Sequence, residues 1–285
     1  MSPPPPAEVT TLGPLVRRLT APNPSAFTNT GTQTYLVGRG EVAVIDPGPD
    51  QLAHVGAIMA ETAGERIVAI LCTHTHRDHS PASRSLQGLT EAPIVGCAPL
   101  ALDDEGIRAD AAFDRDYCPD RVMADGELLS GAGWTLEAIT TPGHTSNHLC
   151  FACPQAEALF SGDHVMGWST TVVSPPDGDM AAYMASLERL LGRTERIYYP
   201  GHGEPVENPR RFVAALAGHR RQREGQIMRL LEERPRPVAD MVSVMYSGVD
   251  ARLHPAARQS VLAHLIDLED RAMVSRHGDE WRRAA

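Results

Sequence analysis

The stretch that decides the fold is Ile67-Val68-Ala69-Ile70-Leu71-Cys72-Thr73-His74-Thr75-His76-Arg77-Asp78-His79, in which three imidazoles and a carboxylate follow an apolar run. The apolar run is too short for a helix and is rich in β-branched residues, so it predicts a buried strand. The polar cluster therefore lies where a strand ends and a loop begins. This is the usual position of a site on an α/β scaffold.

Imidazole and carboxylate groups together suit zinc, iron or manganese, and the lack of a cysteine in the cluster argues against a purely structural thiolate site. A chance cluster of histidines would need no partners elsewhere in the chain. Three later segments nevertheless each place one ligand-type residue beside a glycine at the end of an apolar segment. They are Pro142-Gly143-His144-Thr145, Ser161-Gly162-Asp163 and Pro200-Gly201-His202-Gly203. Together the four segments predict a metal centre.

The four segments resemble the metallo-β-lactamase superfamily, on its glyoxalase II-like branch, over roughly residues 15 to 205. The resemblance implies an α/β fold, the four-layer αβ/βα sandwich of that superfamily. It implies two Zn²⁺ ions as cofactors, with iron or manganese as alternatives. The implied ligands are His74, His76 and His144 for one metal, Asp78, His79 and His202 for the second, and Asp163 as the bridge.

Two metal ions held ~3.5–4 Å apart can share a hydroxide, lower its pKa and stabilise charge on an attacked carbonyl or phosphoryl oxygen. Asp78 is the predicted catalytic residue, because it could orient the nucleophile and accept a proton, although metal coordination alone would also explain its presence. Each ligating histidine needs a partner for its second ring nitrogen. Thr73, Thr145 and Asp46 are the local candidates.

The segment after Asp163 is too polar and too rich in proline and glycine to be core, and we assign it to the wall of the substrate pocket. The predicted substrate-binding residues are His164, Trp168, Ser169, Thr170 and Thr171. Together with Tyr183-Met184-Ala185-Ser186-Leu187, this segment resembles the beta-lactamase-like protein 2 subgroup. That resemblance implies an endoribonucleolytic activity.

The sequence predicts three parts. Residues 1–14 form a proline-rich flexible tail, residues 15–207 a metallo-β-lactamase-fold catalytic domain, and residues 208–285 a small C-terminal domain. The C-terminal part carries fourteen arginines against ten acidic residues, whereas the whole chain has a net charge of −10.

Helical patterns over 210–233, 239–246 and 255–270, followed by a hairpin that turns at Gly278, resemble a winged helix. Arg258, Arg276 and Arg282 are candidates for nucleic-acid contact, but a packing or homodimerisation module fits the same pattern. The modest positive charge does not decide between them.

Cysteine usage and hydropathy bear on location. Five cysteines without framework spacing favour a reducing, cytoplasmic compartment. Cys150 and Cys153 match a redox motif, but they lie in a predicted strand whose alternation would place the two sulfurs on opposite faces. No apolar run approaches the ~18 residues of a membrane span.

The leading functional hypothesis is a dinuclear zinc hydrolase acting on phosphodiesters such as single-stranded RNA. The alternative is a small-molecule ester, thioester or lactone hydrolase of glyoxalase II type, although this chain contains no lysine to supply that family's glutathione contacts. A mononuclear-iron sulfur dioxygenase and a nucleic-acid-binding regulator with an inactive centre are weaker hypotheses, because all seven ligand positions are filled.

Overall fold

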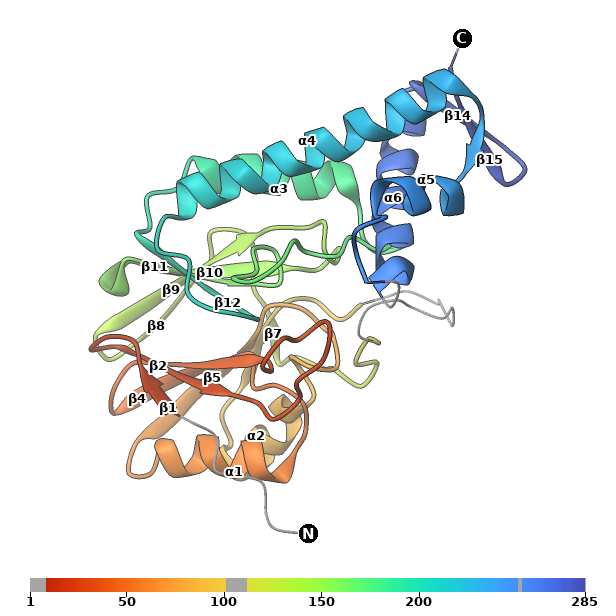
Figure 1. The fold of residues 1–285 in the computed structure, drawn as a ribbon. Helices are drawn as coiled ribbons and strands as arrows, with labels where there is room; N and C mark the ends of the chain where they lie inside the picture. Colours follow the sequence, from red (N-terminus) through yellow and green to blue (C-terminus); the bar gives the residue numbers. More distant parts are fainter. Residues whose placement is uncertain (1–8, 101–111, 251–252, 285) are drawn as a thin grey trace.

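Two β-sheets pack face to face, and helices cover the outer face of each sheet (Figure 1). The structure is a computed structural model, and it describes residues 9–100, 112–250 and 253–284. The layers follow the order helix, sheet, sheet, helix. This confirms the predicted four-layer αβ/βα sandwich.

The first sheet begins antiparallel and becomes parallel from β4 onward, because helices connect its later strands. Helix α1 (Leu52–Glu61) joins β4 to β5, and α2 (Ala82–Thr90) joins β5 to β6. The strands lie in the order β1 (Val9–Thr11), β2 (Val16–Thr20), β3 (Gln33–Val37), β4 (Glu41–Ile45), β5 (Arg66–Cys72), β6 (Ile94–Gly96) and β7 (Arg121–Val122).

The second sheet lies in the order β12 (Ile197–Pro200), β11 (Ala158–Gly162), β10 (Leu149–Cys153), β9 (Trp134–Thr140) and β8 (Leu128–Gly131). A short 3₁₀ turn, η1 (Pro154–Ala156), links β10 to β11, and α3 (Met180–Leu191) lies between β11 and β12 in the chain. Alternation along β10 places Cys150 in the core under α3 and Cys153 in the core between the sheets. The two thiols are free and on opposite faces, as the strand pattern predicted.

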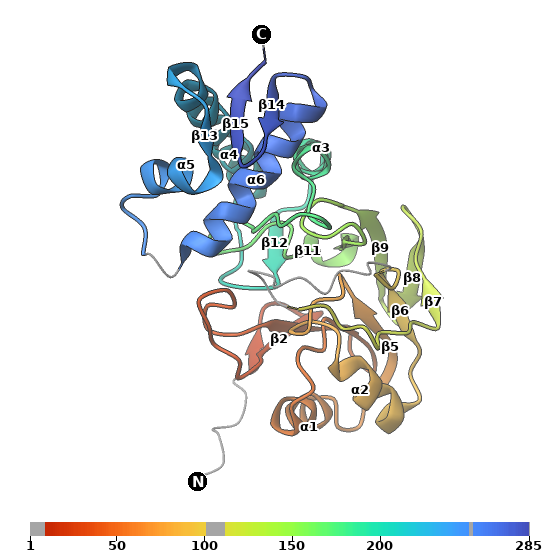
Figure 2. The same ribbon diagram turned by 90° about the vertical axis from the view of Figure 1, so that its right-hand side faces the viewer.

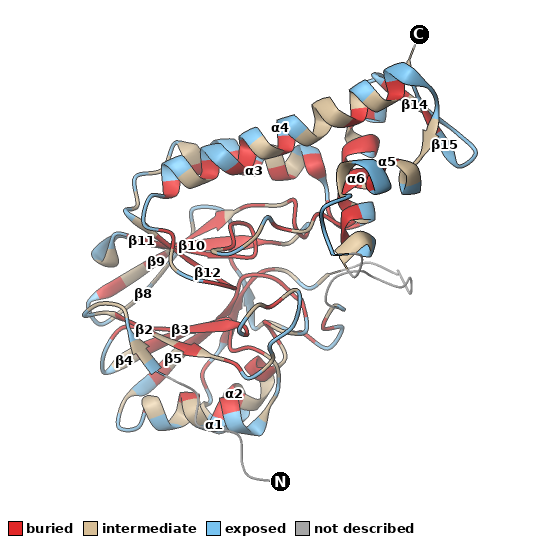
Figure 3. Cartoon of the chain, in the orientation of Figure 1, coloured by how far each residue is buried: buried red, intermediate tan, exposed pale blue. Residues whose placement is uncertain are grey.

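The main core lies between the two sheets, where buried residues are concentrated (Figure 3). The Tyr35 ring on β3 packs against Phe160 on β11 with ring centroids 5.2 Å apart. The Tyr35 hydroxyl donates a hydrogen bond of 2.7 Å to the Pro200 carbonyl at the end of β12. The first sheet is therefore tied to the strand that precedes His202.

The C-terminal domain has its own core, which joins the end of α4 to two helices and a small sheet. Its elements are α4 (Pro209–Glu233), β13 (Arg236–Pro237), α5 (Val238–Met245), α6 (His254–Asp270), β14 (Val274–His277) and β15 (Glu280–Arg283), with sheet order β13-β15-β14. Helices, hairpin and sheet form the predicted winged helix, which stands beside the sandwich (Figure 2).

Helix α4 crosses the predicted division at residue 208. Val213, Leu216 and Ala217 in its first half belong to the core formed with α3 and the second sheet. Ile227 and Leu231 in its second half belong to the C-terminal core. One helix thus contributes to the cores of both parts, and the division at 207/208 stays a prediction.

One expectation is corrected at the N-terminus. Residues 1–14 were predicted to be a flexible tail, but Val9–Thr11 pair with β2 as an edge strand. Three residues give too short a pattern to predict a strand, and Val9–Thr11 form one because β2 supplies the hydrogen-bond partners. Residues 1–8 lie outside the described residues.

Within the described ranges, no helix has the length and apolar character needed to cross a membrane.

Candidate metal centre

The predicted ligands stand on loops that follow strand ends at one edge of the two sheets. His74, His76, Asp78 and His79 follow β5 in the first sheet. In the second sheet His144 lies between β9 and β10, Asp163 follows β11 and His202 follows β12. Because the sheets pack face to face with these edges together, residues far apart in the chain meet at one place.

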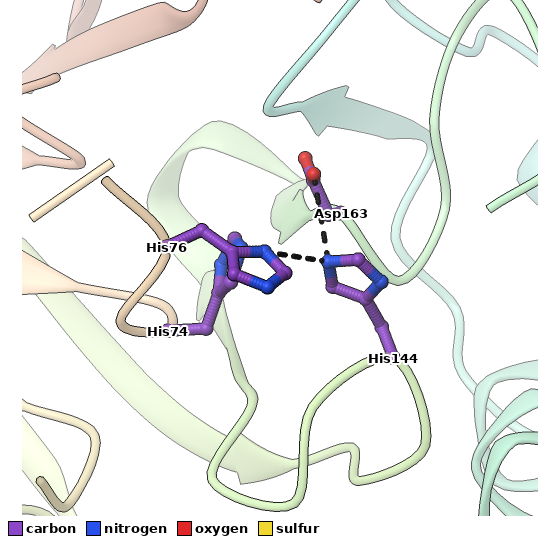
Figure 4. A group of neighbouring side chains, drawn as sticks. All are labelled: His74, His76, His144 and Asp163. Atoms are coloured by element: carbon purple, nitrogen blue, oxygen red, sulfur yellow. Dashed lines mark hydrogen bonds and ion pairs between the residues drawn. The ribbon is translucent and has the colours of Figure 1, made fainter. Parts of the chain in front are cut away.

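The first group of side chains contains His74, His76, His144 and Asp163, with ligand atoms all within 4.8 Å of one another. The Nδ1 atom of His76 lies 3.0 Å from Nε2 of His74 and 3.1 Å from Nε2 of His144. All four residues are buried. Figure 4 shows His76 and His144 turned toward each other, with Asp163 above them.

The second group contains Asp78, His79 and His202, again with ligand atoms within 4.8 Å of one another. The Nε2 atoms of His79 and His202 are 3.3 Å apart, and Asp78 Oδ2 lies 3.1 Å from His202 Nε2. Asp163 joins the groups, because its Oδ2 lies 3.7 Å from His144 Nε2 and 3.4 Å from His202 Nε2. Asp163 thus lies between the two groups, and the bridging role that the sequence resemblance implied for it stays a prediction.

Partners on the far side of each ring fix which nitrogen of the second group faces the centre. Nδ1 of His79 lies 3.0 Å from the Asp46 carboxylate, and Nδ1 of His202 lies 3.4 Å from the Gly31 carbonyl. Since both partners are acceptors, each Nδ1 carries a proton and donates it. In the neutral rings the two Nε2 lone pairs then face each other, an arrangement that a cation between them would stabilise.

The same reasoning applies to the first group. Nδ1 of His144 donates to the Val172 carbonyl at 2.7 Å. The Thr73 hydroxyl donates to Asp46 at 2.8 Å and so accepts from Nδ1 of His74 at 2.9 Å. Nε2 of His74 and of His144 are therefore acceptors directed at Nδ1 of His76.

The charges and unsatisfied atoms of the site also favour a cation. Oδ1 of Asp78 and Oδ1 of Asp163 are buried and accept no hydrogen bond among the described residues. Burial lowers the pKa of His202, but the Asp163 and Asp78 carboxylates outweigh burial and raise that pKa to about 9, so without a cation His202 is protonated and supplies the positive charge that these carboxylates favour. A divalent cation would supply that charge in place of the proton, which leaves the ring neutral and its Nε2 lone pair available. Burial raises the pKa of Asp163, but His202 and His79 hold it well below its usual range.

Buried carboxylates in this state need a positive neighbour, because an unpaired buried charge is strongly destabilising. Converging imidazole lone pairs and free carboxylate oxygens are the donor set that zinc, iron and manganese take. The residues present thus fit a pair of divalent metal ions, and their role as ligands stays a prediction.

Sequence reasoning found some of the orienting groups and missed others. Thr73 and Asp46 contact the histidines as expected, but the Thr145 hydroxyl bonds Asn147 instead. The carbonyls of Val172 and Gly31 were not foreseen, because any residue type offers a carbonyl and only the fold places it.

His148 also has an unforeseen role. Its Nε2 accepts a hydrogen bond of 3.2 Å from the Asp163 backbone nitrogen, and Thr141 holds its Nδ1 at 2.9 Å. His148 is buried and positions the backbone of Asp163.

Five of the predicted ligands, His76, Asp78, His144, Asp163 and His202, line a cavity of about 200 Å³. A second cavity of about 290 Å³ adjoins it through Phe27, Met166 and Val172, which line both. Of the residues predicted to bind substrate, Trp168, Ser169, Thr170 and Thr171 line the second cavity.

His164 is a correction to that prediction. Its side chain is fully buried beneath the rings of Tyr183 and His148, and it lines neither cavity. The polar residues around His164 suggested an exposed position, but at the end of β11 its side chain points into the protein interior.

Two family models match this chain, one in the catalytic part and one in the C-terminal domain. The metallo-beta-lactamase superfamily profile matches residues 28–202, and the beta-lactamase associated winged helix domain matches residues 238–281. The chain is 34% identical to a beta-lactamase-like protein 2 homolog of Drosophila melanogaster, over 95% of this chain and 94% of the relative. It is also 34% identical to an atrochrysone carboxyl ACP thioesterase of Aspergillus fumigatus, over 79% of this chain and 67% of the relative.

Solved structures share the fold over almost the whole chain. A beta-lactamase domain protein from Burkholderia ambifaria superposes with a TM-score of 0.83 at 22% identity, covering 99% of this chain and 95% of that one. A metallo-beta-lactamase family protein from Thermus thermophilus gives a TM-score of 0.78 at 24% identity, covering 96% and 100%. These similarities extend through the C-terminal domain.

Proposed function

Because the chain belongs to the metallo-beta-lactamase superfamily, we propose that it is a hydrolase that holds two divalent metal ions, zinc first, and cleaves phosphodiesters such as single-stranded RNA. The observation that carries the dinuclear assignment is the position of Asp163, whose one carboxylate lies within 3.7 Å of histidines from both ligand groups.

Bound metal ions at such a site supply Lewis acidity and lower the pKa of water. The protein's own groups fix the geometry. Asp46 and Thr73 orient His79 and His74, and Val172 orients His144. Asp78, held by the Thr32 hydroxyl at 3.3 Å, lines the metal cavity, where it can orient a nucleophile and accept its proton.

Two features support a phosphodiester substrate. Similarity to the beta-lactamase-like protein 2 homolog spans both the catalytic part and the winged helix. The sequence resemblance to that subgroup implies an endoribonucleolytic activity. The predicted nucleic-acid contacts Arg258, Arg276 and Arg282 are all exposed, so they are accessible to a polyanion.

A thioester hydrolase is the second candidate. The relative from Aspergillus fumigatus is named as an acyl carrier protein thioesterase, and the same metal chemistry polarises a thioester carbonyl. Metal identity, a cytoplasmic location and a homodimer stay predictions.

The test is metal content by mass spectrometry of protein purified without chelator, paired with assays on a single-stranded RNA oligomer and on a thioester. We expect two metal ions per chain and RNA cleavage that is lost in Asp163→Asn. Thioester turnover with intact RNA would establish the second candidate instead. Protein with a full metal complement but no turnover of either substrate would contradict both.

A further inference from the structure

The cavity next to the metal centre is lined by the catalytic part and by the C-terminal domain. Phe27, Met166 and Trp168 come from loops of the sandwich, Arg220 and Arg223 from α4, and Tyr246 from the residue after α5. The rest of its lining combines apolar side chains with hydroxyl groups and His219, and no described residue in it carries a carboxylate. Two guanidinium groups in such surroundings need an explanation, because burying an unpaired charge is costly.

The two arginines have carbonyl, amide and aromatic partners. Arg220 is 3% exposed, donates to the Thr171 carbonyl and lies over the Tyr183 ring at 5.2 Å. Arg223 is half-buried, donates to the Met245 carbonyl at 3.1 Å and to Gln226, and lies over the Tyr246 ring at 4.4 Å.

No carboxylate of the described residues lies within ion-pair distance of either group, and Nε of both is buried without an acceptor. His219, also in the lining, has a buried Nδ1 without a partner among the residues described.

Some neighbouring arginines are paired with acids, whereas Arg210, Arg211 and Arg229, which are exposed on α4, have no ion pair among the described residues. Burial in a cavity is therefore what distinguishes Arg220 and Arg223. Arg221 on the exposed side of α4 lies 3.9 Å from Glu188, and Arg271 lies 2.7 Å from Glu224. In the described part of the chain, Glu188 and Glu224 pair with exposed arginines, but no acid pairs with the two arginines of the cavity.

Aromatic side chains complete the lining. Trp168 is 41% exposed although it is large and apolar, and it lines the cavity together with Phe27 and Tyr246. Flat apolar rings beside unpaired guanidinium groups are the combination that binds a nucleotide, since bases stack on rings and phosphates pair with arginine.

We propose that this interdomain cavity binds the nucleotide next to the bond cleaved at the metal centre, with its phosphate on Arg223 and Arg220 and its base against the aromatic lining. The proposal rests on the proposed phosphodiester substrate. The two cavities adjoin through Phe27, Met166 and Val172, so one extended strand can enter both. Arg220 also holds Thr171 beside the metal loop, which leaves Arg223 as the residue to vary.

The experiment measures binding of adenosine 5′-monophosphate to the metal-loaded protein by calorimetry, with adenosine as the probe that lacks the phosphate. Arg223→Gln should weaken the binding of the monophosphate about tenfold, since a hydrogen bond between charged groups is lost, and leave adenosine unchanged. Arg223→Lys should keep part of the affinity, because it keeps the charge. Arg221→Gln, on the outer side of the same helix, is the matched control and should bind like the parent.

The kinetic readout separates binding from chemistry. On an RNA oligomer, Arg223→Gln should raise KM about tenfold with kcat and metal content unchanged. Monophosphate binding that is equal in Arg223→Gln, Arg221→Gln and the parent would overturn the inference while leaving RNA cleavage, and so the proposed function, intact.

Failure of the proposed function gives a different result from failure of the nucleotide site. If the protein turns over thioesters and leaves RNA intact, the proposed function fails, and with it the assignment of a nucleotide beside the metals. Octanoate is the probe for the competing occupant, because the apolar lining would also suit an acyl chain. Binding of octanoate without binding of the monophosphate would overturn the phosphate site.

Discussion

Replacing Gly201 by alanine should damage the metal centre while leaving the fold intact. A Cβ at Gly201 would lie 2.5 Å from Oδ1 of Asp163 and 2.7 Å from Cε1 of His79, whereas ordinary contact begins at 3.4 Å. Relief requires a shift of about 0.9 Å at the Asp163 carboxylate. The backbone cannot withdraw, because the Gly201 nitrogen donates to the Gly162 carbonyl and its carbonyl accepts from Gln33, both at 2.8 Å.

A shift of that size exceeds the tolerance of metal coordination, where ligand distances hold to about 0.2 Å. Disturbing a group that merely orients a ligand weakens metal affinity about 10–100-fold, so displacing the bridge itself should reach at least the upper end of that range. Competition with a chromophoric chelator at fixed pH measures the affinity, and mass spectrometry gives the metal bound per chain.

Gly218→Ala is the matched control, because a Cβ at that position on α4 meets nothing within 4 Å. It should bind metal normally and gain up to about 1 kcal/mol of stability from helix propensity. Gly201→Ala protein that holds two metal ions with the parent's affinity would refute the assignment of Asp163 and His79 as ligands around this glycine.

Three further predictions concern the groups around the site. Thr73→Val removes the hydroxyl that links His74 to Asp46. Metal affinity, measured by the same chelator competition, should fall about 10–100-fold. An unchanged affinity would exclude a role of Thr73 in orienting His74. Tyr35→Phe leaves the buried Pro200 carbonyl without its donor, so urea unfolding should show a loss of about 1 kcal/mol, and no loss would mean that water replaces the bond. Burial, with Arg220 nearby, lowers the pKa of His264 to about 3. Below pH 6.5 the unfolded chain binds a proton at His264 that the folded chain does not bind, so lowering the pH destabilises the folded state. From pH 6.5 downward, the free energy of unfolding should fall by about 1 kcal/mol per pH unit more in the parent than in His264→Gln. Parallel pH profiles of the two proteins would contradict the lowered pKa of His264.

The sequence located most of the elements because their signals are local. The helices predicted over 210–233, 239–246 and 255–270 correspond to α4, α5 and α6, and each end lies within one residue of its predicted position. The periodicity of the apolar residues and the glycines and prolines at the ends determine such elements, with little contribution from distant residues. The edge strand Val9–Thr11 was missed, because three residues form a strand only when a neighbour supplies the hydrogen bonds.

The candidate site divides in the same way. The cluster of His74, His76, Asp78 and His79 together with three later segments predicted a metal centre, and the family resemblance implied which residues are its ligands. That Asp163 lies between the two groups, and that Val172 and Gly31 offer carbonyls to His144 and His202, depends on how two sheets pack.

What the sequence determined by itself is therefore the kind of chemistry, since residue type and spacing limit which cofactor the loops can hold. The tertiary structure alone decided where the substrate residues stand. His164 turns into the core, while Trp168 and its neighbours face a cavity completed by Arg220 and Arg223 on a helix some fifty residues later. No local pattern marks those arginines, because a charge left unpaired in a cavity is a property of the surroundings that folding assembles.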